Sequence, residues 1–176
     1  MDAVPPLTVD TVVDLVNEYS AATRAAADEA SHGYPVLPAL GDLGSDTDRC
    51  RRAADALHAV FADGRGPVPV VNDLLVATGV RPRLDECGAT TWVVPDRRRI
   101  LLAAGTVSLT TWIAAHGPDR LGTCEAHRCA DVFVDTSRAA TRRYCSQTCL
   151  DRARVARWRS RQAASRDQGR SGTAAR

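Results

Sequence analysis

The sequence predicts an α+β fold, with a mainly helical N-terminal domain that includes a small β-hairpin or sheet, and a small C-terminal module that ends in a basic helix. Two observations predict it. Apolar residues recur at helical spacing through most of residues 1–119, and only the stretch around Gly88 has strand character. Four of the six cysteines fall within residues 124–149, and an arginine-rich stretch follows them directly. We therefore expect a domain at 1–119, a module at 120–166 and a disordered tail at 167–176.

The N-terminal domain is expected to begin with a helix over residues 8–30. Thr8 is an N-cap residue type, and the apolar positions after it follow the helical period: Val9, Val12, Val13, Val16 and Tyr19. Glycines and prolines make residues 31–44 a loop. The segment from Ser45 to Asp48 fits a Ser-x-x-acid helix start, and the helix that it begins is expected to end at Gly64.

The remaining expected elements of this domain are, in order, a helix at about 69–78, a hairpin of residues 81–87 and 90–94, and a helix from 95 to about 115. Gly79 closes the first of these helices, because glycine adopts the left-handed conformation that often follows a helix. Gly88 marks the turn of the hairpin, and Gly117 with Pro118 stops the last helix.

The charge is divided unevenly along the chain. Residues 1–119 hold 10 Arg and 16 Asp or Glu, a balance of −6, whereas residues 120–176 hold 13 Arg and 5 Asp or Glu, a balance of +8. All 23 basic residues are arginine. A basic C-terminal part on an acidic body indicates a polyanionic partner for that part.

The sequence argues against a membrane or secreted protein. No stretch reaches the roughly 18 consecutive apolar residues that a bilayer-spanning helix needs. The segment from Met1 to Pro6 has neither the basic start nor the apolar run of a signal peptide. We therefore expect a cytoplasmic protein without a membrane partner, whose thiols stay reduced.

An enzymatic function is not expected. The sequence contains no Gly-rich phosphate loop and no His-Glu-x-x-His motif. Several acidic residues and histidines occur without a recognisable catalytic spacing: Asp14, Glu18, His32, His58 and His116. We interpret these residues as surface or core residues.

Cysteine spacing gives the strongest functional signal. Four residues separate Cys124 from Cys129, three separate Cys145 from Cys149, and 15 lie between the two pairs. Zinc binds four thiolates at tetrahedral corners, about 2.3 Å from each sulfur, and two close pairs joined by a longer segment supply such a set. The spacing predicts one structural Zn²⁺ ion per chain, with these four cysteines as its ligands.

Two alternatives stay open at this point: the four cysteines are unrelated, or His127 replaces one of them in a Cys124-x-x-His127 pair. A catalytic zinc fits less well, because such sites have three protein ligands, commonly including histidine, and an open position for water. Cys50 and Cys87 lie far from the pairs in the sequence and are expected to be buried or free thiols.

The segment between the cysteine pairs predicts a hairpin followed by a helix. Residues 132–134 are expected to form a short strand and residues 135–137 a turn. Ser146 is expected to cap a helix that carries Cys149 in its first turn, where the helix dipole favours a thiolate. The predicted arrangement is treble-clef-like: a knuckle, a hairpin and a helix that supplies the last ligand.

The stretch after the last cysteine pair predicts a basic helix, since no proline or glycine occurs between Gln147 and Gly169. Arginine binds phosphate through two hydrogen bonds and can bind guanine in a major groove. We expect the arginines of this helix and of the loop before it to contact nucleic acid: Arg138, Arg142, Arg143, Arg152, Arg154, Arg157, Arg159 and Arg161. The alternative is a solvated charged helix without such a partner.

The C-terminal residues resemble the CGNR zinc-finger family. The resemblance is carried by the first cysteine pair, by the Phe-x-Asp-Thr-Ser-Arg run at 133–138 and by the Arg-Arg-aromatic-Cys-Ser run at 142–146. Upstream, Asp14-Leu15-Val16-Asn17 is similar to the opening motif of the ABATE domain, which precedes the finger in that family.

The signature of the family is altered in this chain. Cys-Gly-Asn-Arg is replaced by Cys149-Leu150-Asp151-Arg152, and the last cysteine pair is spaced by three residues where four is common. All four ligands remain, so the metal site is expected to survive the change. An acidic Asp151 in place of asparagine would weaken or redirect a contact with a base or a phosphate.

The resemblance implies a stress-related transcription regulator whose zinc finger binds DNA and whose N-terminal domain senses a ligand or partner. Our leading hypothesis is therefore a DNA-binding transcriptional regulator with a structural zinc. A small-molecule effector in the N-terminal domain and a homodimer are further expectations. The alternative is a zinc-stabilised protein- or RNA-interaction module without sequence-specific DNA binding, because the residues alone do not separate DNA from RNA.

Overall fold

A computed structural model describes residues 1–171 of the chain, and the side chains of residues 1–162. The N-terminal body contains, in chain order, β1 (Asp2–Ala3), α1 (Val9–Tyr19), α2 (Ala21–Ala26), the 3₁₀ segment η1 (Pro38–Ser45), α3 (Thr47–Ala62), α4 (Pro67–Thr78), β2 (Arg81–Leu84), β3 (Thr90–Val94), η2 (Arg97–Arg99) and α5 (Ile100–His116). The C-terminal part contains η3 (Pro118–Arg120), β4 (Leu121–Thr123), β5 (Val132–Val134) and α6 (Gln147–Ser171). The predicted mixed fold, with a mainly helical body and a basic C-terminal helix, is confirmed.

The first expected helix, 8–30, is broken at Ser20, so that part of the prediction is wrong. Thr8 caps α1 as expected, because its hydroxyl accepts a hydrogen bond from the Thr11 amide at 3.1 Å. Ser20 is extended and its hydroxyl accepts from the Thr23 amide at 3.2 Å, which ends α1 and starts α2. A serine that can cap a new helix competes with continuation of the old one.

Residues after α2 are held by a buried guanidinium. Arg24 is only 3% exposed, and it donates hydrogen bonds to the carbonyl oxygens of Glu29 at 2.7 Å and His32 at 2.6 Å. Its guanidinium also lies 4.2 Å from the centre of the Tyr34 ring. The expected loop at 31–44 is therefore ordered around Arg24, and its end forms η1.

The other helix boundaries differ from the predictions by a few residues. Asp46, not Ser45, caps α3, because its carboxylate accepts from the Arg49 amide at 2.9 Å. Pro67 begins α4, two residues earlier than expected, in the first-turn position that tolerates proline. The expected helix start near residue 95 is the short η2, and α5 follows it from Ile100.

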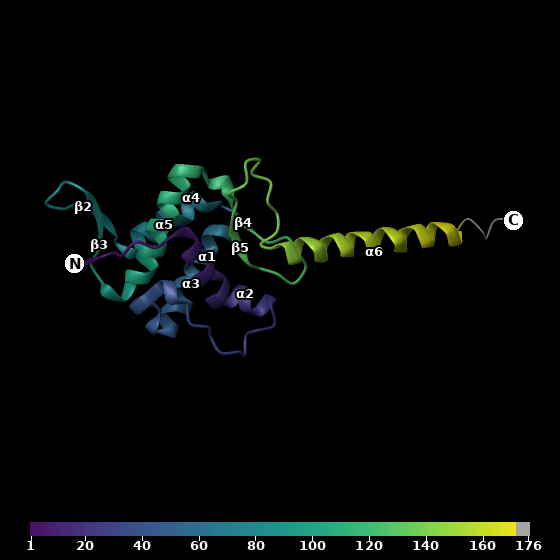
Figure 1. Ribbon diagram of the computed structural model, residues 1–176, viewed down its shortest axis with the longest axis horizontal. Helices are drawn as coiled ribbons and strands as arrows, with labels where there is room; N and C mark the ends of the chain where they lie inside the picture. The colour runs from purple at the N-terminus through teal and green to yellow at the C-terminus, as the bar shows by residue number, and fades with distance from the viewer. Residues whose placement is uncertain (172–176) are drawn as a thin grey trace.

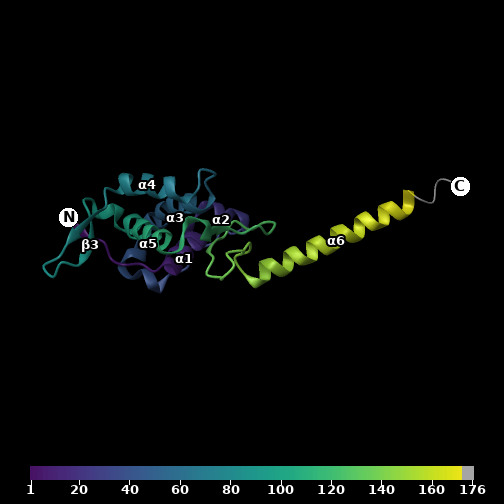
Figure 2. The ribbon, with the colours of Figure 1, turned by 90° about the horizontal axis from the view of Figure 1, so that it is seen from above.

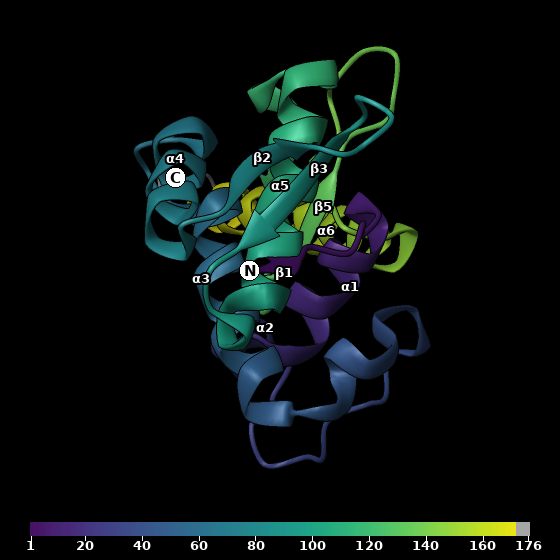
Figure 3. The ribbon, with the colours of Figure 1, turned by 90° about the vertical axis from the view of Figure 1, so that its left-hand side faces the viewer.

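The sheet of the body has the strand order β1-β3-β2, and all its pairs are antiparallel. The hairpin of β2 and β3 was predicted, whereas the two-residue β1 is too short for a sequence signal. Figure 3 shows this hairpin lying across α5. The N-terminal residues that follow β1 run beside the same hairpin, where the Val4 amide donates to the Trp92 carbonyl at 2.8 Å.

One apolar core joins the helices of the body to the C-terminal strands. Its fully buried side chains include Leu15 of α1, Leu57 of α3, Leu101 and Leu109 of α5, and Val132 of β5. Burial of one such side chain contributes about 1.5–3 kcal/mol relative to its exposed state. Because Val132 belongs to this core, the segments expected at 1–119 and 120–166 share one hydrophobic core.

Hydrogen bonds strengthen this connection at β5. The Asn17 side chain donates to the Val132 carbonyl at 3.1 Å and accepts from the Val132 amide at 2.7 Å. The Nε2 atom of His58 lies 3.4 Å from the Ala130 carbonyl oxygen. Helices α1 and α3 thereby fix the position of the chain between the two cysteine pairs.

Helix α6 leaves the body and projects away from it, as Figures 1 and 2 show from two directions. Its backbone is helical to Ser171, so it continues into the segment for which a disordered tail was predicted. Residues 172–176 of that predicted tail lie outside the described residues. Across the described part of the chain, no helix has the combined length and apolar character needed to cross a bilayer.

Candidate metal centre and basic helix

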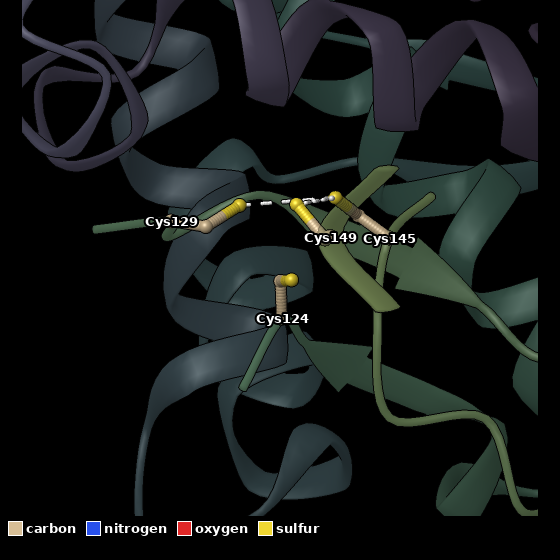
Figure 4. A group of neighbouring side chains, drawn as sticks. All are labelled: Cys124, Cys129, Cys145 and Cys149. Carbon is tan, nitrogen blue, oxygen red and sulfur yellow. Dashed lines mark hydrogen bonds between the residues drawn. The ribbon is translucent and has the colours of Figure 1, made fainter. Parts of the chain in front are cut away.

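Two short segments bring the four cysteines of the C-terminal part together. Cys124 directly follows β4, Cys129 ends the tight turn after it, Cys145 precedes α6, and Cys149 lies in the first turn of that helix. Their sulfur atoms face one another in Figure 4, and all four lie within 4.8 Å of each other. The sequence prediction that these residues form one cluster is confirmed.

The distances suit a tetrahedral metal ion. The sulfur atoms of Cys129 and Cys145 are 3.7 Å apart, and those of Cys145 and Cys149 are 3.6 Å apart. Four sulfurs placed about 2.3 Å from a central zinc ion are separated by roughly 3.8 Å. No disulfide links any of these cysteines. The donor set and its spacing therefore fit a structural zinc site.

Local hydrogen bonds shape both halves of the cluster. In the first half, the Cys124 amide donates to the Asp131 carbonyl at 2.8 Å, and the Cys129 amide donates to the Ala126 carbonyl at 3.2 Å. The turn between them places Arg128 at a φ of 60°, a left-handed conformation that is uncommon for a residue with a side chain. This turn lets Cys124 and Cys129, which are separated by four residues, direct their sulfur atoms toward the same point.

In the second half, Ser146 caps α6 as predicted, since its hydroxyl accepts from the Cys149 amide at 3.2 Å. A backbone hydrogen bond of 3.0 Å from the Glu125 amide to the Arg143 carbonyl joins the two halves. The cap fixes the first turn of the helix, and with it the direction of the Cys149 side chain.

The electrostatics of the cluster favour a bound cation. Burial raises the pKa of the Cys129 thiol to about 12. Burial and the neighbouring Asp131 carboxylate also raise the pKa of Cys145. Burial of Cys149 raises its pKa too, but hydrogen bonds from Ser146 and the other cysteines outweigh this effect and bring it below the usual range. Several thiolates can coexist in this buried site only when a positive ion compensates their charge.

The other candidate ligands lie outside the cluster. His127 is exposed in the turn after Cys124 and is not among the mutually close ligand atoms of the described residues. Cys50 is buried in the core of the body, where burial raises the pKa of its thiol, and Cys87 is exposed in the β2–β3 turn. The structure therefore favours a site with four cysteine ligands over a site in which His127 replaces one of them.

Arg142, one of the predicted nucleic-acid ligands, makes its contacts within the module. Its guanidinium donates to the carbonyl oxygens of Val134 at 3.1 Å and Tyr144 at 2.9 Å, and to that of Cys145. It also lies 4.9 Å from the centre of the Phe133 ring. These contacts hold the loop after β5 against the start of α6, which gives Arg142 a structural role near the metal site.

Three further predicted arginines have partners of their own. Arg143 forms an ion pair with Glu125 and holds the pKa of that carboxyl below its usual range. Arg154 forms an ion pair of 3.2 Å with Asp151. Asp151 is the residue that replaces the asparagine of the family signature. Arg157 donates to the Tyr144 hydroxyl at 3.0 Å. These pairs are exposed, so exchange for a phosphate costs little.

The remaining predicted arginines are exposed: Arg138, Arg152, Arg159 and Arg161. Arg138 lies in the loop after β5, and the other three lie along α6. The apolar side chains of this part of α6 are also uncovered, with Val155 47% and Trp158 56% exposed. The structure thus brings the arginines to one end of the molecule, on the loop and the helix that the cysteine cluster orients.

Asp135 was predicted only as part of a turn, but its side chain organises the loop that follows β5. It is 3% exposed, and its carboxylate accepts from the amides of Ser137 and Arg142, each at 2.8 Å. Hydrogen bonds from Ser137 and then Arg142 hold its pKa below the usual range. An aspartate two residues before serine is a known turn signal, and it could have identified this role.

Comparison with known proteins agrees with this geometry. A family model described as the CGNR zinc finger matches residues 120–162. A search of curated proteins found no match for the chain. The match contains all four clustered cysteines but no residue before 120, so the resemblance of the N-terminal part to the ABATE domain stays a prediction. Residues 120–162 are thus similar to CGNR zinc fingers, and Cys124, Cys129, Cys145 and Cys149 form one structural zinc site.

Proposed function

We propose that the protein binds duplex DNA through α6 and the loop that carries Arg138, and that it acts as a transcription regulator. The observation that carries the proposal is the exposed, arginine-rich α6, which projects from the body while its first turn is fixed at the zinc site. Its 25 residues correspond to a rod about 37 Å long. An α-helix of this kind fits the width of a major groove.

The positions of the arginines on α6 suit contact with both walls of a groove. At about 100° per residue, Arg152 and Arg159 fall on one face, whereas Arg154, Arg157 and Arg161 fall on the opposite face. The side of the helix between these two faces carries the small side chains of Ala153 and Ala156, so its surface lies close to the helix backbone. A helix with a narrow side between two cationic faces can approach base edges while its arginines bind phosphates on each strand.

Charge balance supports the same partner. Among residues 147–162, only Asp151 is acidic, and five arginines are present. Like charges three or four residues apart destabilise a solvated helix, and a polyanion removes that repulsion. The zinc ion supplies folding energy rather than chemistry in this proposal, since four cysteines leave it no open position.

The test is an anisotropy titration of the zinc-loaded chain with a fluorescent duplex at several salt concentrations. The variant Arg152→Ala/Arg159→Ala should weaken binding about tenfold or more and reduce the slope of log K against log salt by up to about 2. Arg97→Ala/Arg98→Ala is the matched control, because it removes equal charge from exposed residues of the body. An equal loss in both variants would mean that α6 has no specific role.

Absence of binding to any duplex at low salt would refute the proposal. The same titration with structured RNA separates the alternative function, an RNA- or protein-interaction module. Tighter binding to RNA than to DNA would favour that alternative.

A further inference from the structure

A groove of about 580 Å³ lies between the N-terminal segment, β3 and α5. Its walls include Val4, Leu7, Trp92, Val107, Trp112 and His116. The volume is within the range of about 300–1,000 Å³ that is typical of small-molecule sites. Among residues 1–162, whose side chains are described, no Asp, Glu or Arg lines the groove, although these residues make up a quarter of the chain. Its surface therefore suits a neutral, largely apolar molecule, and its two indole rings suit an aromatic one.

The indole N–H of Trp112 indicates that a ligand of this groove carries a hydrogen-bond acceptor. This nitrogen is buried and has no hydrogen-bond partner among the described residues. A buried donor without an acceptor destabilises the folded chain. A turn of the Trp112 ring toward the groove would bring this N–H to an acceptor on a bound ligand. Most polar groups of the groove are hydroxyls, such as those of Thr90 and Ser108, which also pair with a neutral oxygen acceptor.

The end of α5 also borders a second hollow. This hollow, of about 360 Å³, is lined by Trp112, Ala115 and His116 together with Arg120 and residues 135–138. Three residues of α5 are thus common to the groove and to the hollow beside the loop that carries Arg138.

Trp112 and His116 form one stacked pair. Their rings are stacked, with centroids 3.8 Å apart and planes 19° apart, and the Nδ1 atom of His116 lies 3.1 Å from the Trp112 carbonyl oxygen. A ligand that reorients the Trp112 ring must therefore also displace the His116 ring, which borders the Arg138 loop.

We propose that the groove binds a neutral aromatic small molecule with one hydrogen-bond acceptor, and that the Trp112–His116 stack transmits its binding to residues 135–138. The effect on DNA affinity rests on the function proposed above, because Arg138 is one of the expected DNA contacts. Ligand binding and loop protection do not depend on that function and are measured without DNA.

The first experiment uses the neutral dye Prodan, a naphthalene with one carbonyl group. Its emission should shift to the blue on addition of the zinc-loaded chain, with saturation at micromolar concentration. Ser108→Phe should weaken this binding by at least about tenfold, since the new ring fills the groove. Ala114→Phe, on an exposed position of the same helix that does not line the groove, should leave it unchanged. Trp112→Phe keeps a ring but removes the donor, and it should weaken the affinity for the dye.

Circular dichroism and melting temperature confirm that each variant is folded before the dye titration. If Prodan does not bind the wild-type chain, or binds both phenylalanine variants equally, the groove is not the site. If the wild-type chain is a dimer that Ser108→Phe dissociates, a second copy occupies the groove and the proposal is also wrong.

The second experiment measures amide hydrogen exchange with and without saturating Prodan. Protection should change in residues 104–116 and also in residues 135–138, whereas the β2–β3 turn around Cys87 should be unaffected. A change confined to residues 104–116 would refute transmission to the loop. When DNA binding occurs, Prodan should alter the DNA dissociation constant at least about fivefold in the wild-type chain and not in Ser108→Phe.

Discussion

Asn17 illustrates how much of this fold depends on a single side chain. Its amide makes two hydrogen bonds with the backbone of Val132, as a neighbouring strand would do on the edge of β5 that β4 leaves open. The sequence marked Asn17 as part of a family-like motif, but its partner lies 115 positions away in the chain. No local pattern could have named that partner.

Replacement of Asn17 by leucine should destabilise the chain. The change leaves the Val132 amide and carbonyl buried without partners, which costs about 1–3 kcal/mol. Urea unfolding followed by circular dichroism measures the loss. The control is Asn72→Leu, at an exposed position of α4. Similar stability of the two variants would show that the amide contact contributes little.

Asp135 should make the stability of the chain depend on pH in the acid range. Because its pKa is lowered in the folded state, the folded chain holds fewer protons than the unfolded chain between the two pKa values. Its stabilising effect is therefore complete above the unfolded value of about 3.9 and disappears as the pH falls through the folded value.

The variant Asp135→Asn isolates this contribution. The difference in unfolding free energy between wild type and variant should be constant near neutral pH and shrink toward zero as the medium is acidified below about pH 4. Effects of acid on the cysteine cluster occur in both proteins and cancel in the difference. A difference that stays constant through the acid range would contradict the role assigned to this carboxylate.

Among the secondary-structure elements, helix α5 was easily predicted, but its contact with α3 was not. Gly105 lies inside α5 at a point where an added Cβ would come within 2.6 Å of Leu57 Cδ1. Leu57 is fully buried, so a shift of its side chain must displace packed neighbours. The sequence gives no sign of this crossing, because glycine inside an apolar helix pattern appears only as a weak position.

Gly105→Ala should lower the stability of the folded chain by about 1–3 kcal/mol through overpacking, less the gain in helix propensity of up to about 1 kcal/mol. The net change is measured by chemical denaturation. Gly64→Ala serves as control, because its Cβ would meet no atom within 4 Å and its φ is not positive. Equal stability of the two variants would indicate that Leu57 adapts.

Elements with strong local signals were predicted well, and those that depend on distant contacts were not. Gly79 and Gly117 end α4 and α5 as expected, because a glycine after an apolar helix pattern is a local signal. Strand β4 was not expected: its three residues, Leu121–Thr123, have meaning only when paired with β5. The break at Ser20 has a different cause, because it follows from the local cap that the Ser20 hydroxyl makes, which the apolar period of α1 does not show.

At the scale of the whole molecule, the zinc site and the helical body are expected to unfold together. The first cysteine pair lies between β4 and β5, the second pair follows β5, and β5 contributes Val132 to the main core. Zinc binding energy in such sites is folding energy, so loss of the ion should weaken the core as well as α6. The cysteine spacing correctly predicted the four-cysteine cluster, whereas it could not reveal the shared core from which we expect the body to depend on the metal.

Metal removal tests this expectation. Excess chelator, or the variant Cys149→Ser, should lower the melting temperature of the entire chain and reduce its helical circular dichroism. Bound zinc, measured by mass spectrometry under native conditions, should fall from one ion per chain to none. Cys87→Ser changes an exposed cysteine outside the cluster and should preserve both values. Separate transitions, with only the smaller one sensitive to chelator, would show that the two parts are independent.

The position of Val132 in the shared core also limits how far the finger can be treated as a portable unit. A fragment cut at the borders of the family match, 120–162, would keep every metal ligand but lose Asn17, His58 and the apolar surface that covers β5. Such a fragment, or a graft of it onto a foreign protein, would carry an uncovered strand that can associate with other chains. Any transplant that is meant to keep the geometry of this finger must therefore bring along a replacement for α1.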